Sequence, residues 1–523
     1  MPAPDDPTSY DRVPYGSLAF PQTHPDRLAT MARVFGLAAA HVANCRVLEL
    51  GCASGGNLIP MAFHLPGSQF VGVDLSRHQV ADAHVTIDAL ALRNIRVEHA
   101  SLVEIDRSWG EFDYIICHGV FSWVERPVQD RILQIARTNL AESGIAYVSY
   151  NTYPGWHMRE MVRRMMRYHT RQFAEAGEQI QQARALLAFL AASAEPGTAY
   201  GQLLQEEVAT LQATADWYLF HEHLEQTNTP LYFSEFIERA GEAGLRYLSE
   251  AELAVVMSRG FPAGIAETLE RISPDILHLE QYMDFVRNRR FRQTLLCHEE
   301  AAPKRALSPA VLHGMSVSCR ASTDGQPIDL APGTPVVFRL GERRLETTEP
   351  VTKAAFALLI EELPRAIPVD ELCQAAIARI RAADASVAVE RLRKTLMEQL
   401  FQCVIGNVVE LHTFQAPFAA AAGARPRADR LAAYQARTQE IVVNALHETV
   451  KLDELSRTVL QLADGERTSG EIVAALVERV AAGAMQVHAN DRTVTDTAAA
   501  RALLEKAVDE TLASLTRAAL LAE

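Results

Sequence analysis

The sequence predicts an α/β protein with a parallel sheet, followed by a helical middle domain and a mostly helical, winged-helix-like C-terminal region. Three observations lead to this prediction. Short apolar runs alternate with helical stretches between residues 45 and 153, strand patterns are lost between about 155 and 300, and a weak internal repeat follows residue 335. Strands and helices in strict alternation are typical of a parallel sheet with helices on both faces.

Length, composition and charge narrow the class of protein. The chain has 523 residues, of which 48% are hydrophobic and 22% charged, as in ordinary globular proteins. It has no apolar run near the ~18 residues of a membrane helix, and its first residues lack the apolar core of a secretory signal. Seven scattered cysteines without a CxxC pair suit reduced thiols. We therefore expect a cytoplasmic protein without membrane insertion.

A formal net charge of −15 bears on the partner. Proteins that bind nucleic acid need a positive field, so we expect no nucleic-acid partner. A substrate with a cationic group is electrostatically easier to bind.

Five apolar runs predict the strands of the sheet, and the stretches between them predict its helices. The runs cover residues 46–51, 69–76, 95–101, 112–119 and 144–153. Residues 55–65, 77–93 and 127–142 carry apolar side chains near helical spacing. Because the runs are almost continuously apolar, we expect a sheet covered on both sides.

The middle of the chain is predicted to be helical. From residue 157 onward, one helix face carries Met158, Met161, Val162, Met165 and Met166, and another carries Arg159, Arg163, Arg167 and Arg171. This pattern favours a packed methionine stripe opposite a solvated basic face, with a partner-binding helix as the alternative. Residues 230–245 and 279–296 also have helical patterns, and the basic run at 287–292 is expected on a solvated or interdomain face.

A weak repeat predicts two related units near the C-terminus. Residues 359–380 align with residues 459–480, so that Glu371 matches Glu471 and Arg379 matches Arg479. Each copy is followed by a further helix and a short apolar run, as in small winged-helix-like units, and residues 416–430 would join the two. Because no Lys/Arg-rich recognition helix is evident, we favour docking modules over DNA-binding ones.

The stretch VLELGCASGGNLIP, residues 47–60, carries the clearest chemical signal. Glycines after a first strand let backbone amides approach a ligand at a helix N-terminus. The spacing from Gly51 to Gly55 and Gly56 lacks the middle glycine of a pyrophosphate loop, and Glu49 would repel a phosphate. This acid suits a ligand with a cationic end, such as S-adenosylmethionine, which has an ammonium, a sulfonium and no phosphate.

A second acid, Asp74, ends the second predicted strand. An acid at this place in a βαβ unit accepts hydrogen bonds from ribose hydroxyls. A purely structural alternative has Glu49 capping loop amides and Asp74 capping the next helix. We favour the ligand interpretation, because both acids, both strands and the glycines occur together.

These motifs resemble those of a known family. Three segments are similar in sequence to class I S-adenosylmethionine-dependent methyltransferases, which have a Rossmann-like domain: VLELGCASGG, FVGVDLS and FDYIICHGVFSWV. YDRVPY, THPDRLATMARVFG, AYVSYNTYPGWHMREM and EQYMDFVRNRRFRQTLLCH resemble methyltransferases with a methyltransferase regulatory domain. That group includes bacterial enzymes that methylate lysines of outer-membrane proteins. The resemblance covers most of the chain.

The resemblance implies a set of residues that bind the cofactor S-adenosyl-L-methionine. The loop after the first strand would hold the methionine part, the second strand the ribose, and the third strand the adenine, while the end of the fourth strand lies beside the cofactor. Ala53 stands where the common glycine turn has its middle glycine, and Ser101 stands where the adenine site usually offers an acid. The implied residues are Glu49, Gly51, Cys52, Gly55, Asn57, Asp74, Leu75, Ser101, Leu102 and Cys117.

The methyl-transfer site is expected at the ends of the fourth and fifth strands, where open α/β sheets bind ligands. A lysine acceptor must lose a proton before it attacks, and an aromatic, partly dry channel would favour its neutral form. We expect His118, Trp123, Tyr150 and Tyr153 to line this channel, with His118 or Tyr150 as proton acceptor or orienting group. Core packing, or contact with the cofactor, is the alternative for each aromatic residue. We expect no metal site, because His221 and His223 are poorly spaced for joint ligation.

The resulting prediction has four parts along the chain. Residues 1–44 form an N-terminal segment that covers the cofactor site, 45–165 the methyltransferase domain, 166–300 the helical regulatory domain and 335–523 the winged-helix-like tandem. We expect methyl transfer to protein lysines; a small-molecule methyltransferase and a non-catalytic, cofactor-binding docking protein are the alternatives. A homodimer is a compatible assembly state.

Overall fold

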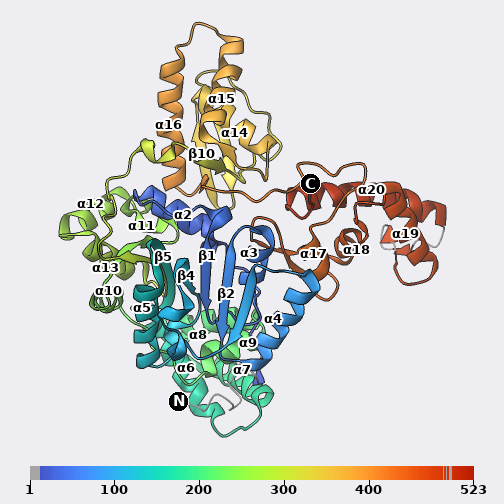
Figure 1. Cartoon of the computed structure of the whole chain (residues 1–523). Helices are drawn as coiled ribbons and strands as arrows, with labels where there is room; N and C mark the ends of the chain where they lie inside the picture. The colour runs from blue at the N-terminus through green and yellow to red at the C-terminus, as the bar shows by residue number, and fades with distance from the viewer. Residues whose placement is uncertain (1–11, 14, 487, 490–491, 494–496) are drawn as a thin grey trace. The chain divides into compact units, whose positions relative to one another are not determined.

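The computed structural model describes residues 12–13, 15–486, 488–489, 492–493 and 497–523 (Figure 1). Half of the motif at residues 10–15 and the start of the segment predicted to cover the cofactor lie outside the described residues. The chain divides into two compact units. The sheet unit comprises residues 1–18, 31–62 and 66–305, and the C-terminal unit comprises residues 19–30, 63–65 and 306–523.

A seven-stranded sheet forms the centre of the sheet unit. Its strand order is β3-β2-β1-β4-β5-β7-β6. Strands β1 to β5 are parallel to one another, and β7 is antiparallel to both β5 and β6. The strands are β1 (Arg46–Leu50), β2 (Gln69–Asp74), β3 (Ile95–His99), β4 (Phe112–Cys117), β5 (Leu140–Asn151), β6 (Leu245–Glu250) and β7 (Phe291–His298). All five predicted strands are confirmed, as is the Rossmann-like α/β fold class.

Two strands contradict the purely helical interpretation of residues 155–300. The pattern in residues 279–296 continues past the real helix end at Arg287, where Asn288 adopts a left-handed φ of 48° and caps helix α13. Strand β7 begins at Phe291 and contains the fully buried Arg292, a charged residue that interrupts the apolar pattern expected of a buried strand. Arg292 pairs there with Glu250, Glu280 and Asp284, so the expected solvated basic face is wrong at this residue.

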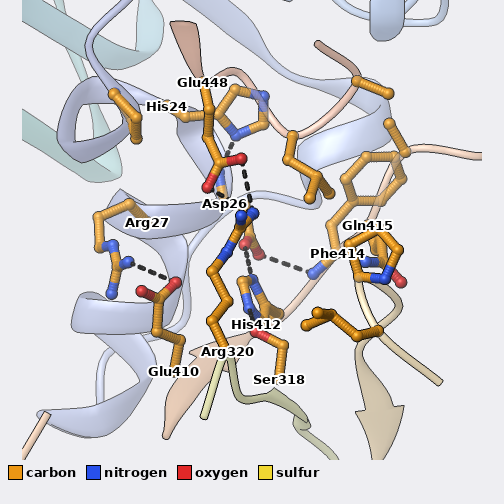
Figure 2. Close-up of a pocket in the computed structure, with 16 residues that line it drawn as sticks. His24, Asp26, Arg27, Ser318, Arg320, Glu410, His412, Phe414, Gln415 and Glu448 are labelled. Atoms are coloured by element: carbon orange, nitrogen blue, oxygen red, sulfur yellow. Dashed lines mark hydrogen bonds and ion pairs between the residues drawn. The ribbon is translucent and has the colours of Figure 1, made fainter. Parts of the chain in front are cut away.

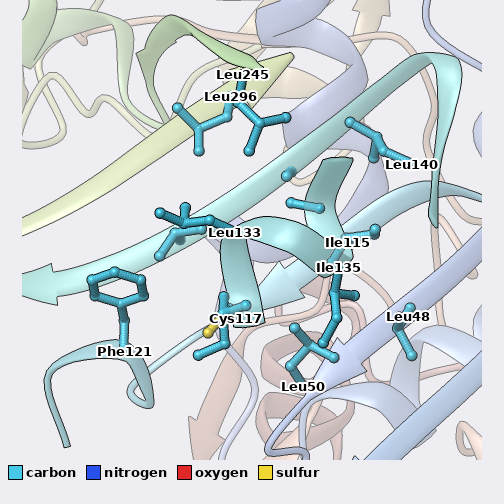
Figure 3. Close-up of a cluster of buried hydrophobic side chains, with 14 of the residues drawn as sticks. Leu48, Leu50, Ile115, Cys117, Phe121, Leu133, Ile135, Leu140, Leu245 and Leu296 are labelled. Atoms are coloured by element: carbon cyan, nitrogen blue, oxygen red, sulfur yellow. The ribbon is translucent and has the colours of Figure 1, made fainter. Parts of the chain in front are cut away.

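One hydrophobic cluster joins the two late strands to the parallel part of the sheet (Figure 3). It contains Leu48 of β1, Ile115 of β4, Leu133 of helix α5, Leu245 of β6 and Leu296 of β7, all buried. The helices among the parallel strands are α2 (Pro25–Val34), α3 (Leu58–His64), α4 (Arg77–Leu90) and α5 (Arg126–Asn139), with short turns η1 (Pro21–Thr23), η2 (Val42–Asn44), η3 (Leu102–Glu104), η4 (Arg107–Trp109) and η5 (Phe121–Trp123). The sheet therefore has a continuous core from β1 to β6.

Helices follow β5 and surround β6. They are α6 (Trp156–Thr170), α7 (Ala176–Ser193), α8 (Ala199–Gln212), α9 (Asp216–Leu219), the π-helix η6 (Phe220–Leu224), α10 (Phe233–Glu242), α11 (Leu253–Val256), η7 (Ser258–Gly260), α12 (Ala263–Ile272) and α13 (Ile276–Arg287). The expected faces of α6 are partly wrong. Val162 and Met166 are buried as predicted, but Arg163 is buried as well, whereas Met158 and Met161 are exposed.

The first part of the C-terminal unit packs three helices beside a small sheet. The helices are α14 (Pro350–Glu361), α15 (Val369–Ala383) and α16 (Val389–Ile405), preceded by the turn η8 (Pro309–Leu312). The sheet has the order β11-β8-β12, with β8 (Ser316–Ser318), β11 (Ile367–Pro368) and β12 (Glu410–His412), and a separate hairpin joins β9 (Val336–Leu340) to β10 (Arg343–Thr347).

The second part of this unit has its own hydrophobic core. Its elements are α17 (Arg430–Gln435), β13 (Ile441–Val443), β14 (Thr449–Lys451), α18 (Glu454–Leu462), α19 (Ser469–Ala481), β15 (His488–Ala489), β16 (Arg492–Thr493) and α20 (Thr497–Arg517). Helices α15 and α19 start 100 residues apart, as the repeat predicts. Among the residues described, no helix is long and apolar enough to cross a membrane.

Candidate active site

The candidate site lies where strands β1, β2, β4 and β5 end. These strands are parallel, so their carboxyl ends meet at one edge of the sheet. The chain direction of the crossovers changes between β1 and β4, because β2 and β3 lie on one side of β1 and β4 and β5 lie on the other. Such a switch point is where open α/β sheets bind ligands.

The glycine loop after β1 contains residues with a left-handed backbone conformation. Gly51 has a φ of 73°, and a Cβ atom built there would lie 2.4 Å from Val120 Cγ2. Ala53 also adopts a left-handed φ, 48°. This conformation explains why related loops use glycine at the position of Ala53, since a left-handed backbone costs other residues roughly 1–2 kcal/mol.

Glu49 is the unusual polar group of the loop. It is buried, and its Oε1 accepts a hydrogen bond of 2.7 Å from Asn57 Nδ2. Its other oxygen, Oε2, is buried without a hydrogen-bond partner. Burial raises the pKa of Glu49 to about 7, although the Asn57 bond opposes this rise. A buried carboxylate oxygen without a partner is costly unless a ligand supplies a donor or a positive charge.

Asp74 fastens the glycine loop to the end of β2. Its Oδ2 accepts a hydrogen bond of 2.8 Å from the backbone N–H of Ala53, and its Oδ1 accepts one of 2.8 Å from Ser76. Asp74 thus binds backbone N–H groups near the start of the next helix, which is part of the structural alternative stated for it. Each carboxylate oxygen can accept a second hydrogen bond, so the predicted bond to ribose hydroxyls stays a prediction. The neighbouring Leu75 is 41% exposed and offers an apolar surface beside this acid.

The residues predicted around the adenine lie after β3. Ser101 precedes the short turn η3, which begins at the half-buried Leu102. The backbone N–H of Ser101 lies 3.4 Å from Glu104 Oε2. Glu104 thus caps the turn that begins at Leu102, and the S-x-x-E spacing of a capping box could have indicated this contact.

Two cysteines predicted beside the cofactor are buried. The Sγ of Cys52 lies 2.7 Å from the position that a Cβ on Gly72 would take, so it packs closely on β2. Cys117 belongs to the hydrophobic cluster of the sheet. Burial raises the pKa of the Cys117 thiol to about 12 and that of Cys52 well above its usual value, so both stay neutral.

His118 stands at the start of the loop after β4. Its Nδ1 is 2.9 Å from Tyr147 Oη, and its ring lies 6.2 Å from that of Phe291. Burial lowers the pKa of His118 to about 4, so the ring is neutral at pH 7. The next residue, Gly119, donates its N–H to Ser149 Oγ at 2.8 Å, and a Cβ added to Gly119 would meet no atom within 4 Å. The open space beside Gly119 can hold part of a ligand.

Tyr150 lies on the other face of β5. Side chains alternate along a strand, so Tyr147, Ser149 and Asn151 share one face and Tyr150 belongs to the opposite one. Its ring stacks on Phe236 with centroids 4.1 Å apart, and its Oη is 3.2 Å from Thr294. The structure therefore places Tyr150 in the core, which was the alternative for each aromatic residue, and alternation along β5 could have indicated Tyr147 and Ser149 instead.

Trp123 and Tyr153 lie closer to the solvent. The half-buried Trp123 packs edge-on against Trp156 with ring centroids 6.2 Å apart. Tyr153 stacks on His157 with centroids 3.9 Å apart, and its Oη donates to Glu160 at 3.1 Å. Burial raises the pKa of Tyr153 to about 12, and Glu160 adds to that rise. Tyr153 is thus a hydrogen-bond donor at neutral pH, and the predicted lining roles of both residues stay predictions.

The described part of the N-terminal segment contacts the glycine loop. The Oγ of Ser17 accepts a hydrogen bond of 2.7 Å from the N–H of Gly56, and a Cβ on Gly56 would lie 2.5 Å from the Ser17 backbone. Four residues earlier, the carbonyl of Val13 accepts a hydrogen bond of 2.7 Å from His221 Nε2 in the π-helix. The described part of this segment therefore connects the loop to the helices that follow β5.

Comparisons with known proteins identify the family. The structure of PKMT2 from Rickettsia typhi is similar over its whole length, with 30% sequence identity and a TM-score of 0.88, covering 97% of this chain and 100% of that one. The same protein in complex with AdoHcy matches with 29% identity and the same score and coverage. The Rickettsia prowazekii protein RP789 is 36% identical over 483 residues, which are 91% of this chain and 86% of that protein. The chain belongs to the PKMT2 family of methyltransferases.

Family models agree with this assignment part by part. Residues 48–146 match a methyltransferase domain, residues 215–298 a predicted methyltransferase regulatory domain, and residues 424–520 the C-terminal winged helix domain of PKMT. These matches confirm the prediction of an S-adenosylmethionine-dependent methyltransferase with a regulatory domain and a winged-helix region. The predicted domain boundaries and site residues stay predictions.

The residues of the site fit the methyl donor of this family. The unpartnered Oε2 of Glu49 suits the ammonium of the donor's methionine part. The open space beside Gly119 borders the loop after β4, which packs against the glycine loop through Val120 and Gly51. Asp74, Leu75 and Leu102 would hold the nucleoside part. S-Adenosylmethionine supplies a methyl group bound to a sulfonium.

A second concave site lies in the C-terminal unit of this methyltransferase (Figure 2). Charged side chains within it pair with one another: Arg27 with Glu410 at 3.5 Å and Arg320 with Glu448 at 2.6 Å. Asp26 is buried there, and it accepts hydrogen bonds from His412 Nδ1 and from the backbone N–H groups of Thr413 and Phe414. Asp26 and Arg27 thus bind residues 410–414 of the first part of this unit, and the Arg320–Glu448 pair connects the first part to the second.

Proposed function

We propose that this methyltransferase transfers the methyl group of S-adenosylmethionine to lysine side chains of a protein. The observation that carries the proposal is the full-length similarity to PKMT2, in which PKMT abbreviates protein-lysine methyltransferase. The buried carboxylate of Glu49 supports it, because the chain retains a polar group that is costly without a cationic ligand.

The residues at the edge of the sheet have simple tasks in this reaction. Methyl transfer is an in-line displacement, so the enzyme chiefly aligns an amine with the methyl group and excludes water. His118 is neutral and can accept a hydrogen bond from the incoming amine or orient it, while Tyr147 fixes the ring. Trp123 would form an apolar wall, which favours the neutral form of a lysine.

The partner and the location follow from the same proposal. A protein acceptor explains why the chain carries docking-type modules after its catalytic domain, and we propose that these modules help to hold that acceptor. We further propose a cytoplasmic location. A homodimer is compatible with this function. A small-molecule acceptor is the second candidate, since the methyltransferase domain alone is compatible with it.

The test is an acceptor screen with the full chain. Tritiated S-adenosylmethionine is incubated with the enzyme and either a protein extract or a small-molecule extract, and labelled proteins are digested and analysed by mass spectrometry. We expect mono-, di- or trimethylated lysine in the protein fraction. The matched control is Asp74→Ala, which should lose about ten- to a hundredfold in cofactor affinity if Asp74 holds the ribose. Label only in small molecules would refute the proposed acceptor.

A further inference from the structure

An apolar surface begins at the edge of the candidate active site. Phe291, the first residue of β7, pairs with Asn151 at the carboxyl end of β5, and its ring lies 6.2 Å from that of His118. Phe291 is 40% exposed. A solvent-facing phenylalanine is thus in contact with a residue predicted to line the methyl-transfer site.

A second group of aromatic rings begins two residues after Asn151, the partner of Phe291, in the loop after β5. Tyr153 stacks on His157 and lies 5.3 Å from Tyr232, and Tyr232 lies 6.1 Å from Phe285 near the end of α13. The loop after β5 and the segment between α13 and β7 are held together through their backbones. The N–H groups of Thr152 and Gly155 donate to the backbone carbonyl oxygens of Arg290 and Arg289, both at 2.9 Å. These rings therefore form one cluster from three parts of the chain.

Helix α6 adds a methionine to the same surface. Met158 is 51% exposed, and its Sδ lies 3.8 Å from Asn288 Nδ2, next to the start of β7. Methionine packs well against varied apolar partners. The two arginines nearest to it in the predicted basic stripe, Arg159 and Arg163, are instead turned inward. The helix thus exposes an apolar side chain where the sequence favoured a basic face.

We propose that Phe291, Tyr153, His157, Met158, Tyr232 and Phe285, here called the aromatic rim, bind the segment of the acceptor protein that contains the target lysine. This proposal rests on the proposed function. The occupant is an extended segment in which apolar residues flank the lysine. Apolar flanks would cover the exposed rings, and the aromatic faces together with the carboxylate of Glu235 attract an ammonium on its way to the transfer site.

The test compares two peptides that differ only in the residues flanking one lysine: leucine and valine in one, serine and glycine in the other. The wild-type enzyme should have a kcat/KM at least tenfold higher for the apolar peptide. Phe285→Ser and Met158→Ser should each reduce this preference several-fold by raising KM, with the affinity for S-adenosylhomocysteine unchanged. The matched control is Phe189→Ser, because Phe189 is 65% exposed on α7 and lies outside the aromatic rim.

Each outcome supports or overturns the proposal. Equal use of both peptides by the wild-type enzyme, or equal effects of Phe285→Ser and Phe189→Ser, would overturn the docking role. Labelled lysines in a protein extract with neither peptide methylated would overturn it while leaving the proposed function intact. Absence of any methylated lysine would overturn both. A dimer that dissociates in Phe285→Ser, measured by sedimentation, would assign the aromatic rim to a second copy of the chain instead.

Discussion

Asn57 donates its side-chain N–H to Oε1 of Glu49 at 2.7 Å and leaves Oε2 of the same buried carboxylate without a partner. One oxygen is thus held in place from within the protein, and the other awaits a donor. A buried carboxylate oxygen without a partner is costly, so this asymmetry supports a binding role for Glu49.

Replacing Glu49 should therefore separate binding from stability. We expect Glu49→Gln to weaken the binding of S-adenosylmethionine by about ten- to a hundredfold, since a hydrogen bond to a charged group contributes ~1.5–3 kcal/mol. At pH 8 the same change should not lower the free energy of unfolding of the cofactor-free protein, because it removes a buried charge. Calorimetry and urea denaturation measure the two quantities. Glu98→Gln, at an exposed carboxylate on β3, is the control.

Binding of the cofactor should also depend on pH through Glu49. Burial raises the pKa of Glu49 to about 7 from 4.5, so the folded protein holds a proton there that the unfolded chain has lost. Its stability accordingly falls by roughly 3 kcal/mol as the pH rises from 4.5 to 7. A cationic ligand restores the ionised form, so binding at pH 6 should release a proton.

The measurement is calorimetry in buffers of different ionisation enthalpy. Affinity should decrease up to tenfold per pH unit below about 7 and stay constant above it. Glu49→Gln should release no proton at this position. Proton release that persists in this variant would assign the titration to another group.

Gly51 and Ala53, two left-handed residues of the glycine loop, should respond differently to exchange. Ala53→Gly relieves a left-handed alanine and increases the entropy of the unfolded chain, and since each effect is about 1 kcal/mol, stability and cofactor affinity should change little. Gly51→Ala should lower both, because its new Cβ would meet Val120 Cγ2 at 2.4 Å. Denaturation and calorimetry of both variants test this contrast. Equal losses in the two variants would mean that the loop rearranges freely.

The site residues that lie at strand ends could be predicted from the sequence. The residues whose place depends on which face of a strand they occupy were predicted from residue type alone, without the alternation of side chains along the strand. Glu49 and Asp74 end apolar runs, so their place at the edge of the sheet follows from the pattern alone. Tyr150 was chosen for its residue type, although alternation along β5 separates it from Ser149. Residues brought from afar, such as Ser17 on the glycine loop, have no signal in one sequence, because only tertiary structure brings positions 17 and 56 together.

The fold shows the same limit at β7. Five strands are apolar and were predicted, whereas β7 carries Arg292 and Thr294 in fully buried positions. Three acids from β6 and α13 bind the guanidinium, and none of them is adjacent to it in the sequence. A buried ion network removes the apolar pattern on which strand prediction depends.

In the C-terminal unit, Asp26 should stabilise the segment around residues 412–414. Burial acts to raise its pKa, but hydrogen bonds from His412 and Thr413 outweigh this effect and hold the pKa below its usual value. Asp26→Asn should lower the free energy of unfolding by about 2–3 kcal/mol and speed amide exchange at Thr413 and Phe414, which donate to Asp26 Oδ1 at 2.7 Å. Because the folded pKa is depressed, the stabilisation is present above pH ~4 and is lost as the pH falls further.

Hydrogen exchange read by mass spectrometry checks this prediction, with Glu398→Gln as an exposed control in the same unit. Exchange in the segment that is equal in both variants would show that Asp26 contributes little to its stability.

The pH dependence of turnover should reveal the acceptor. Only the neutral amine of a lysine attacks a methyl group, and with a free pKa of ~10.4 well under 1% is neutral at pH 7. Turnover should therefore rise from pH 7 to about pH 8.5 or beyond. His118 cannot produce this rise, because burial lowers its pKa to about 4 and the ring is neutral throughout the range. His118→Gln should accordingly lower kcat about tenfold or more, through lost orientation of the amine, while the rising limb keeps its slope and position. Initial rates with saturating cofactor at five pH values, for the wild-type enzyme and His118→Gln, give both quantities. A wild-type rate that is flat from pH 7 to 8.5 would exclude an unperturbed lysine, and a rising limb that disappears only in His118→Gln would make His118 the titrating group and contradict its neutral state.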